Sequence, residues 1–148
     1  MVRPQYHFRA SPQGLLAWDV RHLIRQSSEL PVREVAVASI DELNDDHWYS
    51  HGIARPTCRS VIEHFSLMLA ADLSFPIILD SQGRVMDGMH RVCKAFMEGR
   101  THLPAVQFQQ DPEPDFIGRD PETLPYTEVS ATEGDLAHNV QSIKECRF

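Results

Sequence analysis

The sequence lacks the long apolar segments and the cysteine pairs that mark several classes of protein. No apolar run approaches the ~20 residues that a helix needs to cross a bilayer, and residues 1–14 contain no apolar stretch typical of a signal peptide. The three cysteines form no CxxC pair, which disfavours a disulfide framework or a zinc knuckle and favours reduced thiols. We therefore expect a cytoplasmic protein with no membrane partner.

Basic residues are also scarce. The chain has 14 Lys and Arg against 21 Asp and Glu, which gives a formal net charge of −7. Because general affinity for DNA depends on cations that neutralise phosphates, this charge disfavours a DNA partner, although a local basic pocket remains compatible with it. The sequence does not indicate an oligomeric state.

What is present is enough for one globular domain. The chain has 148 residues, of which 42% are hydrophobic. Hydrophobic spacing predicts a small α/β (α+β) fold with a mixed β-sheet and packed helices. The expected helices lie within 14–28, 57–71 and 89–97, and the expected strands lie at 32–38, 76–79, 84–87 and 103–108.

The clearest amphipathic helix is expected after an N-cap at Thr57. Its apolar residues follow the i, i+3, i+4, i+7 spacing of a stripe that packs on a core; they are Cys58, Val61, Ile62, Phe65, Met68 and Leu69. His64 is expected to face solvent. In the helix from Met89 the corresponding stripe is Met89, Val92, Cys93, Phe96 and Met97, with Gly99 at the C-terminal cap.

The composition changes after residue 108. Residues 109–148 are rich in proline and acidic residues, and we interpret them as a loop-rich extension over a domain formed by residues 1–108. The last part, 136–148, is compatible with a short helix.

The stretch "DGMHR", Asp87–Arg91, lies where a strand is expected to end and a helix to begin. Helix N-termini carry partial positive charge, so two basic side chains are unfavourable there unless an anion is bound. Unpaired N–H groups and a glycine make this position suitable for a phosphate. Gly88, Met89, His90 and Arg91 are therefore candidate phosphate- and nucleotide-binding residues.

A purely structural interpretation of the same loop is about equally compatible with local physics. Asp87 is then an N-cap, Gly88 serves the turn, and His90 and Arg91 are solvated. Since Arg91 lies off the apolar stripe, its removal is expected to cost little stability under either interpretation.

The stretch "PIILDSQGRVMDGMHRVCKAFMEGRTHLPAVQF" resembles the core of the ParB/sulfiredoxin superfamily. The resemblance implies a small domain of that type, in which the loop matching Asp87–Arg91 binds nucleotide phosphates. Met89 stands where sulfiredoxins have their catalytic cysteine, and Cys93 lies on the apolar stripe, so sulfiredoxin chemistry is not expected. The acidic tail does not resemble the helix-turn-helix domain of chromosome-partition ParB proteins.

Two other branches match the loop at four of its five positions. Free-serine kinases have Asp-Gly-His-His-Arg, and DNA-phosphorothioation proteins have Asp-Gly-Gln-His-Arg. The resemblance thus implies either phosphotransfer to a small-molecule substrate or a non-catalytic nucleotide- or DNA-associated regulatory role. The implied cofactors are ATP, ADP or CTP with Mg²⁺.

Phosphotransfer needs phosphate clamps, a metal and a group that orients the acceptor. Asp87 is the candidate metal ligand or base, and the resemblance suggests Glu42 as a second catalytic residue. The alternative for Glu42 is a capping box with Ser39 at the start of a short helix, which we favour. "HWYSH", 47–51, is interpreted as a loop that packs Trp48 and Tyr49 over the pocket, in preference to a zinc site.

Overall fold

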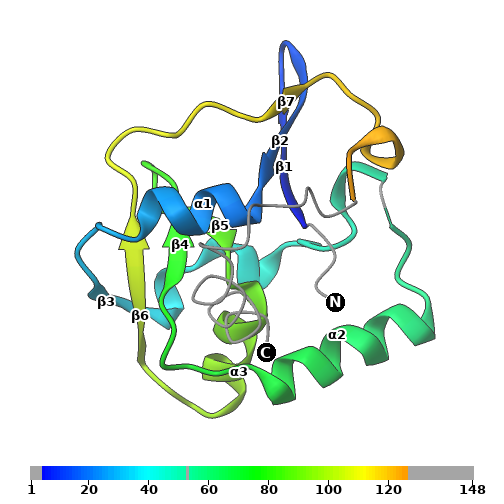
Figure 1. Ribbon diagram of the computed structural model, residues 1–148. Helices are drawn as coiled ribbons and strands as arrows, with labels where there is room; N and C mark the ends of the chain where they lie inside the picture. Colours follow the sequence, from blue (N-terminus) through cyan, green and yellow to red (C-terminus); the bar gives the residue numbers. More distant parts are fainter. Residues whose placement is uncertain (1–4, 53, 127–148) are drawn as a thin grey trace, which may run out of the picture.

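The structure, a computed structural model, describes residues 5–52 and 54–126 and contains two small β-sheets with three α-helices. A four-stranded sheet has the order β3-β6-β4-β5, and a three-stranded sheet has the order β1-β2-β7 (Figure 1). The predicted α+β class with a mixed sheet is confirmed, because β4 runs parallel to β6 and antiparallel to β5. None of the helices among these residues is long and apolar enough to span a bilayer.

The four-stranded sheet is made of the strands expected from the sequence. They are β3 (Arg33–Ala36), β4 (Ile77–Leu79), β5 (Val85–Asp87) and β6 (His102–Gln107). The tight turn between β4 and β5 places Gly83 at φ +84°, as its sequence predicts.

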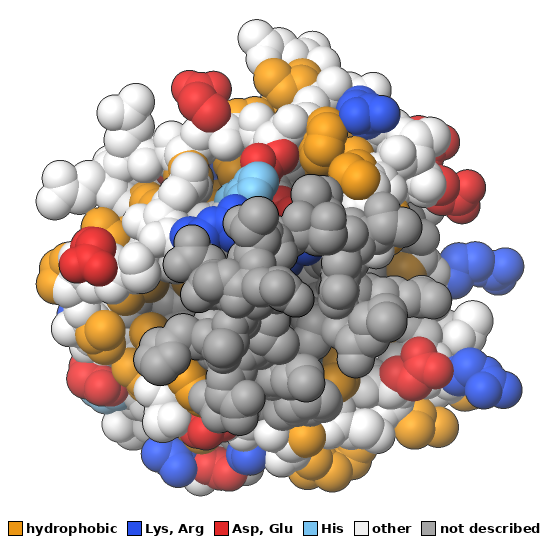
Figure 2. Space-filling view, in the orientation of Figure 1, with side chains coloured by type: hydrophobic (Ala, Val, Ile, Leu, Met, Phe, Trp, Pro, Cys, Tyr) orange, Lys and Arg blue, Asp and Glu red, His pale blue; other side chains and the backbone are white. Residues whose placement is uncertain are grey.

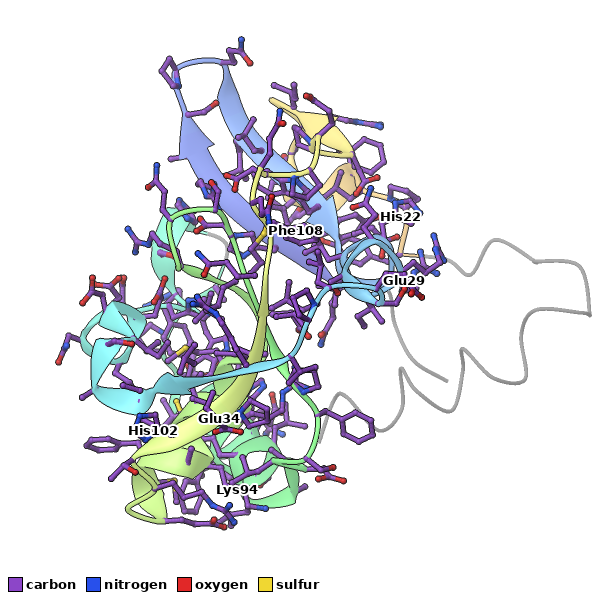
Figure 3. The ribbon with its side chains drawn as sticks, turned by 90° about the vertical axis from the view of Figure 1, so that its left-hand side faces the viewer. His22, Glu29, Glu34, Lys94, His102 and Phe108 are labelled. Carbon is purple, nitrogen blue, oxygen red and sulfur yellow. The ribbon has the colours of Figure 1, made fainter. Side chains whose placement is uncertain are left out.

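Both faces of this sheet are buried, which explains the continuous apolar run of β4. Ile77 and Leu79 point into the core on the α3 side, whereas Ile78 points into the core on the α1 side. Phe108 follows β6 on the side of the N-terminal hairpin, and Lys94 of α3 lies at the opposite end of the molecule (Figure 3).

The N-terminal region departs from the prediction of a helix over 14–28. Residues 6–19 form a hairpin of β1 (Tyr6–Ser11) and β2 (Gly14–Asp19), and α1 is restricted to Val20–Ser27. Asp19 marks the boundary, because its side chain accepts a hydrogen bond from the Arg21 N–H and caps α1. Helical spacing in 14–19 was therefore misleading, since pairing with an unpredicted strand determined the conformation.

The short helix expected after Ser39 is present only as a 3₁₀ turn, and its predicted capping box is wrong. The chain forms two 3₁₀ turns, η1 (Val37–Ser39) and η2 (Asp41–Asn44), and η2 has no side-chain cap. The Ser39 hydroxyl donates backward to the Ala36 carbonyl at 2.7 Å. The capping box does not form, so Glu42 is available for other contacts.

Helix α2 (Cys58–Ala70) begins after its predicted N-cap, since the Thr57 hydroxyl accepts from the Ser60 N–H. Its orientation differs from the expected one: the half-buried residues are Ser60, His64, Leu67 and Met68. No residue of α2 is buried. His64, which was expected in solvent, faces the body of the protein and contacts His90. Of the predicted apolar stripe only Met68 is half-buried, and the other five residues are exposed.

Helix α3 (Met89–Met97) follows β5 and ends near Gly99, which has φ +69°. Met89 and Val92 are buried as predicted. Phe96 and Met97 are not, with exposed fractions of 64% and 48%. The predicted stripe of α3 therefore reaches the core only in its first half.

The described part of the acidic extension contacts the hairpin. β7 (Phe116–Ile117) pairs with β2, and η4 (Pro121–Thr123) follows it. The Trp18 indole N–H donates to the Pro112 carbonyl, and Asp115 accepts from the Asp19 N–H. The short helix considered for 136–148 lies outside the described residues.

Asp80 holds the turn between β4 and β5 and should be a large contributor to stability. Its buried carboxylate accepts the Gln82 and Arg84 N–H groups at 2.8 Å each and pairs with Arg9 at 2.6 Å. We expect Asp80→Ala to lower the free energy of unfolding by about 2–4 kcal/mol, because it leaves these donors unsatisfied.

The control for this prediction is Asp45→Ala. Asp45 also pairs with an arginine, but its side chain is 51% exposed, so the loss should stay below about 1 kcal/mol. Urea unfolding followed by circular dichroism measures both variants, and equal losses would contradict the role assigned to Asp80.

Candidate functional site

The N-terminus of α3 has the strand–turn–helix geometry expected from "DGMHR". β5 ends at Asp87, and Gly88 is the N-cap residue of α3, with φ +102° and no side-chain cap. The first turn contains no acidic residue. Its N–H groups and the positive end of the helix dipole therefore favour an anion at this position.

Only glycine fits at position 88. A Cβ atom there would lie 2.6 Å from the Arg91 Nη2 atom and 2.7 Å from the Ile77 Cγ2 atom, in addition to the strain of a positive φ. The turn thus brings the backbone directly over the Arg91 guanidinium and the start of β4.

Arg91 is not the exposed clamp that the sequence suggested. Its exposed fraction is 1%, and its Nη2 atom lies 3.0 Å from the Asp87 carboxylate. Asp87 is correspondingly an ion-pair partner and not the N-cap of the structural alternative. Removal of Arg91 should therefore cost stability, because it leaves a carboxylate without its internal partner.

His90 lies in a cluster of rings from three segments. Its Nε2 atom is 2.9 Å from the Nδ1 atom of His64 in α2. The Trp48 ring stacks on both imidazoles, with its centroid 4.8 Å from that of His90 and 4.3 Å from that of His64. Burial, with a smaller contribution from His64, lowers the pKa of His90 to about 4. At neutral pH the two histidines are a neutral donor–acceptor pair.

The loop at 47–51 supplies the cover that its aromatic residues suggested. Trp48 packs against the core and the His64–His90 pair, while the Tyr49 hydroxyl lies 3.1 Å from the Ser60 hydroxyl of α2. His47 contacts Trp48 edge-on, and burial lowers its pKa. Within 5–52 and 54–126, no group of three His, Cys, Asp or Glu side chains is arranged to hold a metal ion.

Glu42 is buried and bonds across to the β5 strand. Its Oε1 atom accepts the Val85 N–H at 3.0 Å and the Arg84 Nε–H at 3.1 Å. These bonds replace the predicted capping box and fix Glu42 at the start of the strand that ends at Asp87. They also raise the pKa of Arg84.

A cavity of about 690 Å³ lies beside this cluster, between the N-terminal hairpin and the loop that follows η2. Trp48 lines it, so the cavity and His90 share one side chain. The loop Asp87–Arg91 itself is not part of the lining. The charged and imidazole groups of the lining are His7, Arg9, Glu42, Asp45, Asp46, His47, His51, Asp80 and Arg84.

Sequence reasoning missed the hairpin side of this cavity. His7 and Arg9 come from β1, which was not predicted. They lie far from Trp48 in the sequence, and no sequence pattern indicated that they line the same cavity. The His7 Nε2 atom is buried and has no hydrogen-bond partner among the described residues. Burial lowers the pKa of His7 to about 3, so this imidazole is neutral.

Cys93 fits the expectation of an unreactive thiol. This residue of α3 packs against the core, and burial raises its pKa to about 11. Thiolate chemistry at neutral pH is accordingly disfavoured.

Comparison with known proteins returned no relatives: no family model, curated protein or solved structure matches the chain.

The buried histidines predict a loss of stability in mild acid. The pKa values of His7 and His90 are lower in the folded chain than the usual 6.5, so the unfolded chain binds more protons as the pH falls from about 6.5 to 4. We expect the free energy of unfolding to decrease across this window, by about 1–3 kcal/mol for each histidine after allowance for partial exposure.

The test compares His90→Gln with His102→Gln by urea unfolding at several pH values. His102 is exposed, so its variant should retain the wild-type dependence on pH, whereas His90→Gln should reduce it and leave the part contributed by His7. An unchanged pH profile in His90→Gln would refute the assignment to His90.

Proposed function

We propose that this protein binds the phosphate groups of a nucleotide at the N-terminus of α3, and that it belongs to the ParB/sulfiredoxin superfamily. The observation that carries the proposal is the α3 N-terminus without a side-chain cap at Gly88, whose backbone approach excludes any larger residue. Together with the resemblance of "DGMHR" to a phosphate-binding loop, this geometry favours an anionic ligand.

The neighbouring cavity supports a ligand larger than a free phosphate. Its volume of about 690 Å³ is of the size that binds small molecules, and Trp48 offers it an aromatic surface for a base. Because Trp48 also stacks on His90, a ligand in contact with this ring lies one side chain away from the first turn of α3. His7 and Arg9 of β1 line the same cavity.

If the protein is an enzyme, the activity that we propose first is phosphotransfer to a small-molecule acceptor. Asp87 is 18% exposed at its side chain and offers one carboxylate, which suits Mg²⁺ because that ion usually takes one or two carboxylates together with phosphate oxygens. When bound, Mg²⁺ would neutralise charge on the phosphates. Glu42 lies in the cavity wall, where it can orient an acceptor hydroxyl.

The second candidate is a non-catalytic nucleotide- or DNA-associated regulatory module. It is favoured because both candidate catalytic carboxylates already have partners within the protein. Asp87 pairs with Arg91, and Glu42 accepts hydrogen bonds from Arg84 and from the Val85 N–H. Such carboxylates need no catalytic role to explain them. The net charge of −7 disfavours the DNA branch of this alternative.

Nucleotide binding is tested by a thermal-shift screen with ATP, ADP, CTP and pyrophosphate, each with and without Mg²⁺. A nucleotide at 100 times its Kd should add about 2.7 kcal/mol to the free energy of unfolding. We expect His90→Ala to weaken binding about tenfold, the effect of losing roughly 1.4 kcal/mol of contact. His102→Ala is the matched control. Absence of any shift, or an equal response of both variants, would refute the site.

The catalytic form makes a separate prediction about Asp87. With ATP or ADP, Mg²⁺ and a mixture of small hydroxyl compounds, the wild type should turn nucleotide over, and Asp87→Asn should bind nucleotide without turnover. Asparagine keeps the shape of the side chain but removes the charge that a metal or a base requires. Binding without turnover in the wild type would select the regulatory module. A salt-sensitive shift of duplex DNA in a gel would favour its DNA-linked branch.

A further inference from the structure

The outer face of α2 is the largest group of exposed apolar side chains on one element of the described chain. Four of its residues expose about half of their surface or more, namely Val61 (49%), Ile62 (63%), Phe65 (47%) and Leu69 (55%). Exposed apolar side chains are also seen at the lower edge of the face in Figure 2, where α2 lies in Figure 1. Contiguous patches of this kind usually mark interaction sites.

The opposite side of α2 is fixed by polar contacts, so the helix cannot simply rotate its apolar face inward. Ser60 bonds to Tyr49, and His64 bonds to His90. At the C-terminus, the Lys94 ammonium of α3 donates to the carbonyls of Leu69 and Ala71 at 2.9 and 2.6 Å. Rotation would break all of these contacts.

We propose that the apolar face of α2 binds the same face of a second copy of this chain, with the two helices antiparallel about a two-fold axis. In such an interface one self-complementary patch serves both copies. This inference does not depend on the proposed nucleotide site.

The charges of α2 favour an antiparallel partner. Arg59 lies in the first turn and Asp72 just after the C-terminus, and each is on the wrong end for the dipole of its own helix. In an antiparallel pair, the N-terminus of one helix lies beside the C-terminus of the other. Asp72 then meets the positive end of the second helix. Arg59 lies beside Asp72 of the second copy, at the end whose last carbonyls already accept from Lys94.

The register follows from the sequence. A two-fold axis between Phe65 and Ser66 places Ile62 opposite Leu69 of the second copy, because the two positions are equally far from the axis. The same operation places Arg59 level with Asp72 of the second copy. One register thus pairs both the apolar residues and the opposite charges.

The test is sedimentation velocity of the full chain over a range of concentrations. We expect a reversible dimer, and Ile62→Asp should raise its dissociation constant at least about tenfold, as expected when a charge enters an apolar contact. Val32→Asp is the control, since Val32 is exposed to the same degree (61%) and lies outside α2. Circular dichroism verifies that each variant is folded.

A charge exchange tests the antiparallel arrangement. Arg59→Asp should weaken the dimer, and adding Asp72→Arg should restore it, because opposite charges again face each other. Asp72 also accepts hydrogen bonds from Ser74, so restoration in the double variant is more informative than the effect of Asp72→Arg alone. A monomer at every concentration, equal weakening by Ile62→Asp and Val32→Asp, or no restoration would overturn the proposal.

Discussion

The ion pair between Arg91 and Asp87 beneath Gly88 is the constraint on which the junction between sheet and helix depends. A guanidinium with 1% exposure must keep a carboxylate partner, because an unpaired charge in this environment is costly. Asp87 ends β5 and Arg91 lies in the first turn of α3, so their pairing fixes the angle between strand and helix. The close approach then admits only glycine at position 88.

A basic residue near a helix N-terminus can either hold the loop in place or bind an anion. Arg91 is buried and holds the loop through its ion pair with Asp87. In the proposed site, the groups available to an anion are the backbone N–H groups of the first turn of α3 and the half-buried His90. His90 is itself held by Trp48 and His64, which belong to two other segments. The site is therefore assembled from three segments that lie apart in the sequence.

The same ring cluster sets the orientation of α2. His64 and Ser60 turn inward to satisfy His90 and Tyr49, and Lys94 binds the last carbonyls of the helix. Polar contacts thus outweigh the burial of the apolar stripe within one chain. The exposed apolar residues are the consequence, and a second copy of the chain is the partner that we propose for them.

Local sequence determined the elements whose signals are short-range. The turn at Gly83, the cap at Thr57, the doubly buried β4 and the strand–turn–helix at Gly88 all follow from neighbouring residues, and the structure has each of them. Tertiary contacts decided the rest. Residues 14–19 form a strand because they pair with β1. Glu42 does not form the predicted capping box, because its carboxylate accepts the Val85 N–H of β5 instead. The inward turn of His64 and the burial of Arg91 depend on polar partners, which hydrophobic periodicity does not record. The cavity between the hairpin and Trp48 joins positions far apart in the chain, about which local patterns carry no information.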